Sequence, residues 1–328
     1  MKILPIFIPH LGCPFACVFC DQNKITNTNF IDYAKIKKNV IDFVEYNKSI
    51  EKEIAFFGGT FTGLDTVHQE RFFQIVRPFL DSKTHIRIST RPDKISKEIL
   101  INLRKNGVKT IELGIQSFSD SVLTASSRGY LSEIAIENCK LVKDFGFNLG
   151  IQIMPGLPKF NQETLELTLQ KIIDISPKFI RIYPAVVLAD TELATMFREG
   201  KYKPLSLEKA IDISCKISVL MQENNIDIIK IGLHSDIDSK DIVAGPYHES
   251  FGELVRAKIL YDKIIKQYRI PQTLNISKTD ISLFKGFSAK MLNDLKKQLD
   301  LDKIPIIISD SINKNEFILN TNKTEIYW

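Results

Sequence analysis

Short strand-like runs alternate with amphipathic helical runs from residue 3 to about residue 233, and few folds accommodate such a pattern. The runs rich in branched and aromatic residues cover 3–8, 53–57, 85–90, 110–115, 148–154, 179–183 and 227–231. Helical periodicity covers 33–46, 67–79, 97–106, 133–145, 164–175 and 207–224. This alternation predicts an α/β fold with a parallel sheet and helices outside it. Six or more βα units in about 230 residues fit a barrel, complete or open, better than a two-layer sandwich.

Unusual segments follow the predicted strands, where a barrel of this kind places its chemistry. The stretch LGCPFACVFCDQ follows the first strand, and FFGGTFTGL follows the second. STRPD ends the third strand, GIQS ends the fourth and MPGLP ends the fifth. We therefore expect these segments to meet at one edge of the sheet and to form one site.

The alternating pattern of strands and helices ends after residue 233. A polar loop leads into a predicted helix over 251–268, followed by a small module with strands at 273–276, 305–309 and 316–319 and a helix at 289–299. We predict three parts: a core barrel over 1–235, a connecting loop and helix over 236–270, and a small C-terminal α/β module over 271–328.

The composition, 44% hydrophobic and 25% charged, is that of an ordinary globular protein. The start, MKILPIFIPHLG, is too short for a signal peptide, and no 18 apolar residues follow one another, so we expect no membrane association. The predicted location is the cytoplasm. Because thiols stay reduced there, a tight group of cysteines predicts metal binding and not disulfides.

Three of the five cysteines, Cys13, Cys17 and Cys20, form the pattern CxxxCxxC on one short loop. Soft thiolate ligands select iron-sulfur clusters, zinc or Cu(I). A zinc site would need a fourth ligand, for which the candidates are His10, Asp21 and His248. Structural zinc usually uses two ligand pairs, and this sequence has no second pair, so we favour a 4Fe-4S cluster with one iron left open. Cys139 and Cys215 are expected to be buried apolar residues.

This cysteine pattern after a first strand, with Phe19 just before the last cysteine, resembles the radical S-adenosylmethionine (SAM) superfamily. The resemblance implies a radical SAM-type (βα)6 partial TIM barrel with a small C-terminal α+β module. It also implies an oxygen-sensitive cluster whose open iron binds the amino and carboxylate groups of SAM. An electron from a low-potential donor such as flavodoxin or ferredoxin then cleaves a C–S bond and gives a 5′-deoxyadenosyl radical.

Four further blocks, from ISTRPDKIS to IRIYPAVVLADTELATMFREGKYKPLS, resemble the radical SAM region of the Elongator catalytic subunit family over residues 5–205. By this resemblance several residues contact SAM. Glycine backbones approach its amino group, Arg128 suits its carboxylate, two glutamines suit its ribose, and a turn flanks its adenine. The predicted cofactor-binding residues are Phe19, Gly58, Gly59, Thr60, Ser89, Arg91, Gln116, Arg128, Gln152, Pro155 and Gly156. The alternatives are surface ion pairs for Arg91 and Arg128 and a satisfied polar residue in the barrel for Gln152.

The chain departs from the Elongator subunits in three ways. Its first two cysteines are closely spaced, as in oxygen-independent coproporphyrinogen oxidases. Ser89 stands where relatives often carry a glutamate. Only 60 residues follow Tyr268, too few for the acetyltransferase domain of those subunits, so we do not expect that activity.

We predict a radical SAM enzyme that abstracts hydrogen from its substrate. The Elongator resemblance favours RNA, such as a tRNA base, and the net charge of +5 permits it. Lysines of the C-terminal module would then form a basic platform: Lys285, Lys290, Lys296 and Lys297. The alternatives are a porphyrin-type substrate and a non-catalytic binding protein stabilised by zinc or a cluster.

The segment AGPYHESFGEL holds His248, a candidate catalytic residue because histidine titrates near neutral pH. The alternative reading is a loop that caps the next helix, with Ser250 as N-cap and Glu253 at the third helical position.

Overall fold

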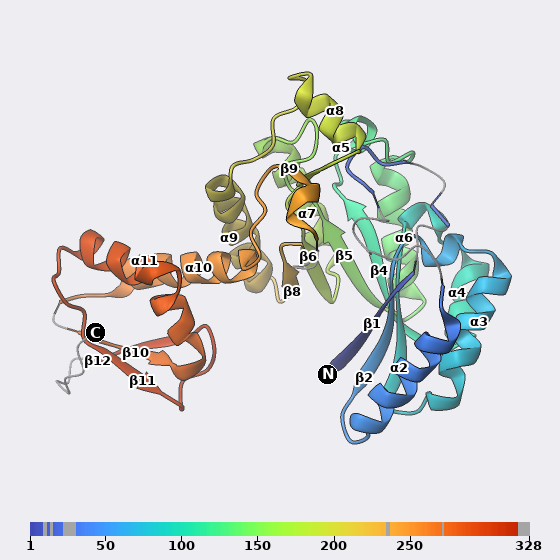
Figure 1. Ribbon diagram of the computed structural model, residues 1–328, viewed down its shortest axis with the longest axis horizontal. Coiled ribbons are helices and arrows are strands. Elements are labelled where there is room, and N and C mark those ends of the chain that lie inside the picture. Colours follow the sequence, from blue (N-terminus) through green and yellow to red (C-terminus); the bar gives the residue numbers. More distant parts are fainter. Residues whose placement is uncertain (9–11, 14–15, 22–30, 234–236, 271, 321–328) are drawn as a thin grey trace. The chain divides into compact units, whose positions relative to one another are not determined.

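The structure is a computed structural model that describes residues 1–328 except 9–11, 14–15, 22–30, 234–236, 271 and 321–328 (Figure 1). It contains two compact units. The first consists of Met1–Ala210 and Leu220–Tyr247, and the second of Ile211–Val219 and His248–Trp328. The domain boundaries predicted near residues 235 and 271 fall on undescribed residues.

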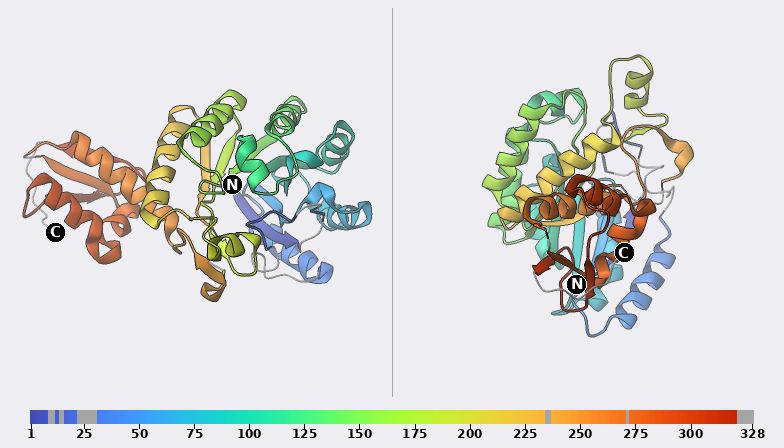
Figure 2. Two further views of the ribbon diagram at one scale, coloured as in Figure 1. Left: turned by 90° about the horizontal axis from the view of Figure 1, so that it is seen from above. Right: turned by 90° about the vertical axis from the view of Figure 1, so that its left-hand side faces the viewer.

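A seven-stranded sheet forms the centre of the first unit, and its strand order follows the chain. Every neighbouring pair is parallel, which confirms the predicted α/β fold. The strands are β1 Lys2–Ile8, β2 Lys52–Gly58, β3 Thr84–Thr90, β4 Val108–Gln116, β5 Asn148–Ile153, β6 Phe179–Ile182 and β8 Asp227–Ile231. The sheet curls into an open barrel with helices on its outer face (Figures 1 and 2).

The long helices of the first unit alternate with the strands of the sheet, as predicted. A side-chain cap fixes several starts: the Asp65 carboxylate accepts from the His68 N–H, and Ser96 accepts from Ile99. Aromatic residues join helix to sheet, since Phe56 packs on Phe72 at 4.9 Å between ring centroids. The helices are α2 Tyr33–Tyr46, α3 Thr66–Val76, α4 Lys97–Lys105, α6 Ser132–Asp144, α7 Gln162–Ile175 and α9 Leu207–Glu223. Residues 211–219 of α9 belong to the second unit.

Three irregularities interrupt the register of the seven-stranded sheet, and each adjoins a polar residue of the barrel. They lie between Ile86 and Arg87, between Gly114 and Gln116, and between Ile180 and Arg181. A bulge redirects the side chain next to it. The irregularities therefore affect where Arg87, Gln116 and Arg181 point.

Four short elements were not predicted: the helices α5 Asp120–Ala125 and α8 Glu192–Arg198, and the antiparallel strands β7 Val187–Leu188 and β9 Ile242–Ala244. Each is too short to show a clear hydrophobic period. The β7–β9 pair brings the segment after β8 back beside the segment after β6.

The second unit contains a small α+β module, together with the helix α10 that the sequence analysis assigned to a connecting segment. Its three-stranded sheet has the order β11-β10-β12, with β10 and β11 parallel and β12 antiparallel. The elements are α10 Phe251–Gln267, β10 Thr273–Ser277, α11 Ile281–Leu299, β11 Ile306–Ser309 and β12 Phe317–Asn320. The prediction that the last helix starts at residue 289 is wrong. The helix begins eight residues earlier because Leu283 and Phe284 are buried in the module's core.

Among the described residues, no helix combines the length and apolar character needed to cross a membrane.

Candidate active site

A cavity of about 160 Å³ opens at the carboxyl ends of the strands in the first unit. Side chains from the segments after β1 to β6 line it, as the barrel architecture predicts. Most of the predicted site residues are among them: Cys13, Cys17, Phe19, Cys20, Gly58, Gly59, Thr60, Ser89, Arg91, Gln116, Arg128 and Gln152. The remainder of the wall is Phe7, Phe57, Thr90, Glu112, Gly114, Met154, Arg181, Tyr183, Val186, Leu188, Leu233 and Ile237.

The two unpredicted helices anchor the cysteine loop through the backbone of Val18. Its N–H donates to the carbonyl of Ser126 just after α5 (3.3 Å), and its carbonyl accepts from the N–H of Leu193 in α8 (2.7 Å). Cys17 and Phe19, on either side of Val18, are each 8% exposed and belong to one apolar cluster. The loop is therefore packed into the first unit on both sides.

A second contact seats the loop against the turn after β2. The Cys13 Sγ lies 2.9 Å from the Thr60 Oγ1. The backbones of Gly12 and Gly63 touch, because a Cβ on Gly63 would lie 2.1 Å from the Gly12 carbonyl oxygen. Gly58 has a φ of +111°, and its Cβ would lie 2.3 Å from the Ile8 carbonyl oxygen. Burial raises the pKa of the Cys13 thiol, an effect that the bond to Thr60 reduces.

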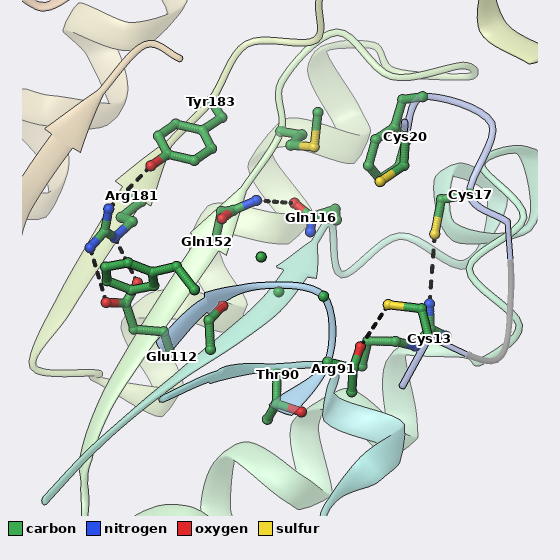
Figure 3. Close-up of a pocket in the computed structure, with 18 of the residues that line it drawn as sticks. Cys13, Cys17, Cys20, Thr90, Arg91, Glu112, Gln116, Gln152, Arg181 and Tyr183 are labelled. Carbon is green, nitrogen blue, oxygen red and sulfur yellow. Dashed lines mark hydrogen bonds and ion pairs between the residues drawn. The ribbon is translucent and has the colours of Figure 1, made fainter. Parts of the chain in front are cut away.

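Two buried arginines converge on Cys17. Arg128 Nη1 donates to the Cys17 Sγ at 3.1 Å, and Arg91 Nη1 lies 3.6 Å from the same atom (Figure 3). Each arginine is 4% exposed, so neither forms a surface ion pair. Arg91 pairs with Asp93 at 2.9 Å and donates to the backbone carbonyl of Arg128. Burial opposes the charge of Arg128, but Tyr130 and Cys17 accept its hydrogen bonds and raise the pKa of its guanidinium.

An amide pair occupies the middle of the cavity. Gln152 Nε2 donates to Gln116 Oε1 at 3.2 Å (Figure 3). Gln116 has a φ of +71°, which is rare for a residue with a side chain, and it follows a register irregularity in β4. Backbone strain of this kind concentrates at functional sites.

Charged residues that the sequence motifs do not single out form a network at one side of the cavity, where Glu112 and Arg181 are part of the wall. Glu112 Oε1 accepts from Arg181 Nη2 at 3.0 Å and from Arg87 Nη1 at 2.8 Å. Arg87 also donates to Glu53 at 2.6 Å, and Arg181 Nη1 donates to the Tyr183 hydroxyl at 3.1 Å. A buried parallel strand is normally apolar throughout. The charged residues inside IEL, IRI and HIRIST could therefore have identified these positions from the sequence.

The other predicted residues lie apart from this wall. Pro155 and Gly156 do not line the cavity; their carbonyls accept from Ala185 N–H at 2.9 Å and from Tyr202 hydroxyl at 2.5 Å. His10 lies outside the described residues.

His248 belongs to the second unit, where its Nδ1 accepts from the Ser250 N–H at 3.0 Å. Ser250 does precede α10, but its side chain makes no cap hydrogen bond, so its predicted capping role is wrong. The His248 ring satisfies the Ser250 backbone instead.

Comparison with known proteins gives consistent results. The sequence matches the radical SAM superfamily over residues 7–172 and the radical SAM C-terminal domain over residues 177–260. It is 28% identical over 250 residues to the tRNA uridine(34) acetyltransferase of Methanocaldococcus jannaschii, covering 69% of this chain and 46% of that protein. The chain thus spans about half the length of the curated relatives it matches.

Two solved structures share the fold. The archaeal Elp3 of Methanocaldococcus infernus superposes with a TM-score of 0.64 at 24% identity, covering 81% of this chain and 63% of its own. Coproporphyrinogen III oxidase of Escherichia coli gives a TM-score of 0.51 at 21% identity, covering 68% and 52%. The superfamily match takes in half of this chain, including its cysteine loop and most of its cavity wall. The chain therefore belongs to the radical SAM superfamily of enzymes.

Proposed function

We propose that Cys13, Cys17 and Cys20 hold a 4Fe-4S cluster whose fourth iron binds SAM in the same cavity. Three thiols on one anchored loop, all lining one cavity, support this proposal. Within the described parts of the chain, no three His, Cys, Asp or Glu side chains gather closely enough for a single metal ion. A cluster needs less convergence, because each thiolate binds a different corner.

The surroundings of the thiols suit an anionic cluster. Arg91 and Arg128 direct two buried positive charges at Cys17, which offsets the charge of thiolate ligands. Hydrogen bonds to the ligating sulfurs are one of the means by which proteins set cluster potentials. The hydrogen bond between Thr60 and Cys13 holds a second sulfur in place.

The remaining cavity wall offers the contacts that SAM needs. Gly58 and Gly59 have no side chains, so SAM can come close to their backbone. Gln116 and Gln152 offer amide groups for its ribose. When bound, the cluster supplies the electron for reductive cleavage of SAM. Apolar residues after β6 and β8 limit access of water to this chemistry: Val186, Leu188, Leu233 and Ile237.

As substrate we propose an RNA base, with a tRNA uridine as the first candidate. Two archaeal relatives are tRNA uridine(34) acetyltransferases, which supports this choice. The helix α11 carries four lysines that suit contacts to phosphates: Lys285, Lys290, Lys296 and Lys297. A low-potential electron donor such as flavodoxin or ferredoxin would supply the electrons.

The first experiment is anaerobic reconstitution with iron and sulfide. We expect about four irons per chain and 5′-deoxyadenosine from SAM under dithionite. Cys17→Ala should abolish both. Cys139→Ala is the matched control, because Cys139 is also buried but lies in α6 and does not line the cavity, and it should retain both. One zinc per chain without iron, or SAM cleavage by Cys17→Ala, would contradict the proposal.

A further inference from the structure

The guanidinium of Arg181 has N–H donors without a partner in the part of the chain that the structure describes. Arginine carries five N–H groups. Nη2 donates one of them to Glu112 at 3.0 Å, and Nη1 donates one to the Tyr183 hydroxyl at 3.1 Å. The Glu112 Oε2 also lies 2.6 Å from Nε, in an ion pair that lacks the geometry of a hydrogen bond. The other three have no acceptor among the described residues. Since Arg181 is only 9% exposed and lines the cavity, these donors need an explanation.

Arg87 provides a direct comparison in the same network. It lies on β3, is 2% exposed, and shares the Oε1 of Glu112 with Arg181. Glu53 binds the other edge of Arg87, and Arg87 does not line the cavity. Arg87 therefore serves the internal network, whereas Arg181 joins that network to the cavity.

The polar groups of the cavity form two ends with the glutamine pair between them (Figure 3). The cysteine loop with Arg91 and Arg128 makes one end, and Arg181 with Tyr183 makes the other. Aromatic rings flank the second end: Arg181 lies over Phe57 at 4.9 Å, and Phe57 packs on Phe7 at 6.3 Å. Planar ligands are favoured beside such rings.

We propose that Arg181, oriented by Glu112 and Tyr183, recognises the substrate at the end of the cavity opposite the cysteines, by donating to a carbonyl oxygen of a neutral planar ring. This inference rests on the proposed function, which places the cofactor at the cysteine end. A uracil base has the required chemistry, because it is flat, uncharged and carries two carbonyl acceptors.

The charge of the network favours a neutral acceptor over a carboxylate. Two arginines and two glutamates, Arg87, Arg181, Glu53 and Glu112, sum to zero formal charge. A carboxylate at Arg181 would add an uncompensated negative charge in a buried site, which is costly. A carbonyl oxygen accepts a charge-assisted hydrogen bond without that cost.

The test measures binding of an RNA hairpin by fluorescence anisotropy. Two anticodon stem-loops are compared, one with uridine at the first anticodon position and one abasic there. We expect the wild-type protein to prefer the uridine hairpin at least tenfold, because hydrogen bonds to a charged donor are worth 10- to 100-fold in affinity. Arg181→Lys should remove most of this preference, since lysine keeps the charge but loses the planar fork.

Arg87→Lys is the matched control and should keep the preference, and Tyr183→Phe should reduce it even if Arg181→Lys fails to fold. Equal preference in Arg181→Lys and Arg87→Lys, or none in the wild type, would overturn the inference. So would coproporphyrin III, a tetracarboxylate, binding in an Arg181-dependent manner. Iron content and SAM cleavage of the wild type, measured separately, show whether the proposed function itself has failed.

Discussion

Replacing Gly63 by alanine tests whether the cysteine loop is held by the turn after β2. The added Cβ would lie 2.1 Å from the Gly12 carbonyl oxygen and 3.0 Å from its carbonyl carbon. Gly63 does not have a positive φ, so alanine brings no backbone strain of its own. The effect is therefore purely steric, and it acts directly on the residue before Cys13.

The size of the displacement follows from contact distances. A carbon and an oxygen in contact lie about 3.3 Å apart, so the two segments must separate by about 1 Å. The bond between Cys13 and Thr60, now 2.9 Å long, would then lengthen and weaken. Overpacking of this kind costs about 1–3 kcal/mol, which leaves a protein of ordinary stability folded.

We expect Gly63→Ala to remain folded but to retain less than half of the wild-type iron after reconstitution, with a matching loss of 5′-deoxyadenosine. Gly200→Ala is the control: its φ of +70° makes alanine unfavourable, but no atom lies within 4 Å of the added Cβ. It should lose comparable stability and keep its iron. Full iron loading of Gly63→Ala would refute the seating of the loop on this turn.

Three further predictions concern the rest of the protein. Glu112→Gln should lower the free energy of unfolding, measured in urea, by about 3–5 kcal/mol, because it leaves buried arginines without a countercharge. Glu70→Gln, in a surface ion pair, should lower it by under about 1 kcal/mol. Similar losses in the two variants would contradict the buried network. Burial raises the pKa of Cys139 and Cys215 to about 12, so both should resist iodoacetamide at pH 8 in the native protein, and rapid labelling in a mass-spectrometric assay would count against this. Burial and the charge of Lys109 lower the pKa of His85 in the folded protein. As the pH falls, the imidazole is therefore protonated first in the unfolded chain, near pH 6.5. The contribution of His85 to the free energy of unfolding should be complete above that pH and should decline as the pH falls below it. His85→Phe should flatten this acid-side slope, because His85 Nε2 has no partner among the described residues, and an unchanged slope would refute the assignment.

The strands and long helices of the first unit could be predicted because each is long enough to repeat its hydrophobic period. The helix α7, for example, buries Leu165, Leu169 and Ile172 at helical spacing. The helices α5 and α8 have six and seven residues, so their pattern is too brief to distinguish from a loop. Their role became clear only from the backbone bonds to Val18.

The candidate site shows the same division. The spacing of the cysteines predicts their chemistry, since few functions need three thiols on one loop, and the structure places all three at one cavity. Arg181 and Glu112 lie inside otherwise apolar strands, and which strand faces receive charges depends on register irregularities that the sequence does not display. The Gly12–Gly63 contact joins segments 51 residues apart and depends on tertiary packing.

The central claim is that the cluster has one iron without a protein ligand. Electron paramagnetic resonance of the reduced, reconstituted protein tests it directly, in the presence and absence of SAM. We predict that SAM changes the spectrum of wild-type protein, because it binds the cluster itself. An iron-loaded protein whose spectrum is the same with saturating SAM would show that a side chain already occupies the fourth position.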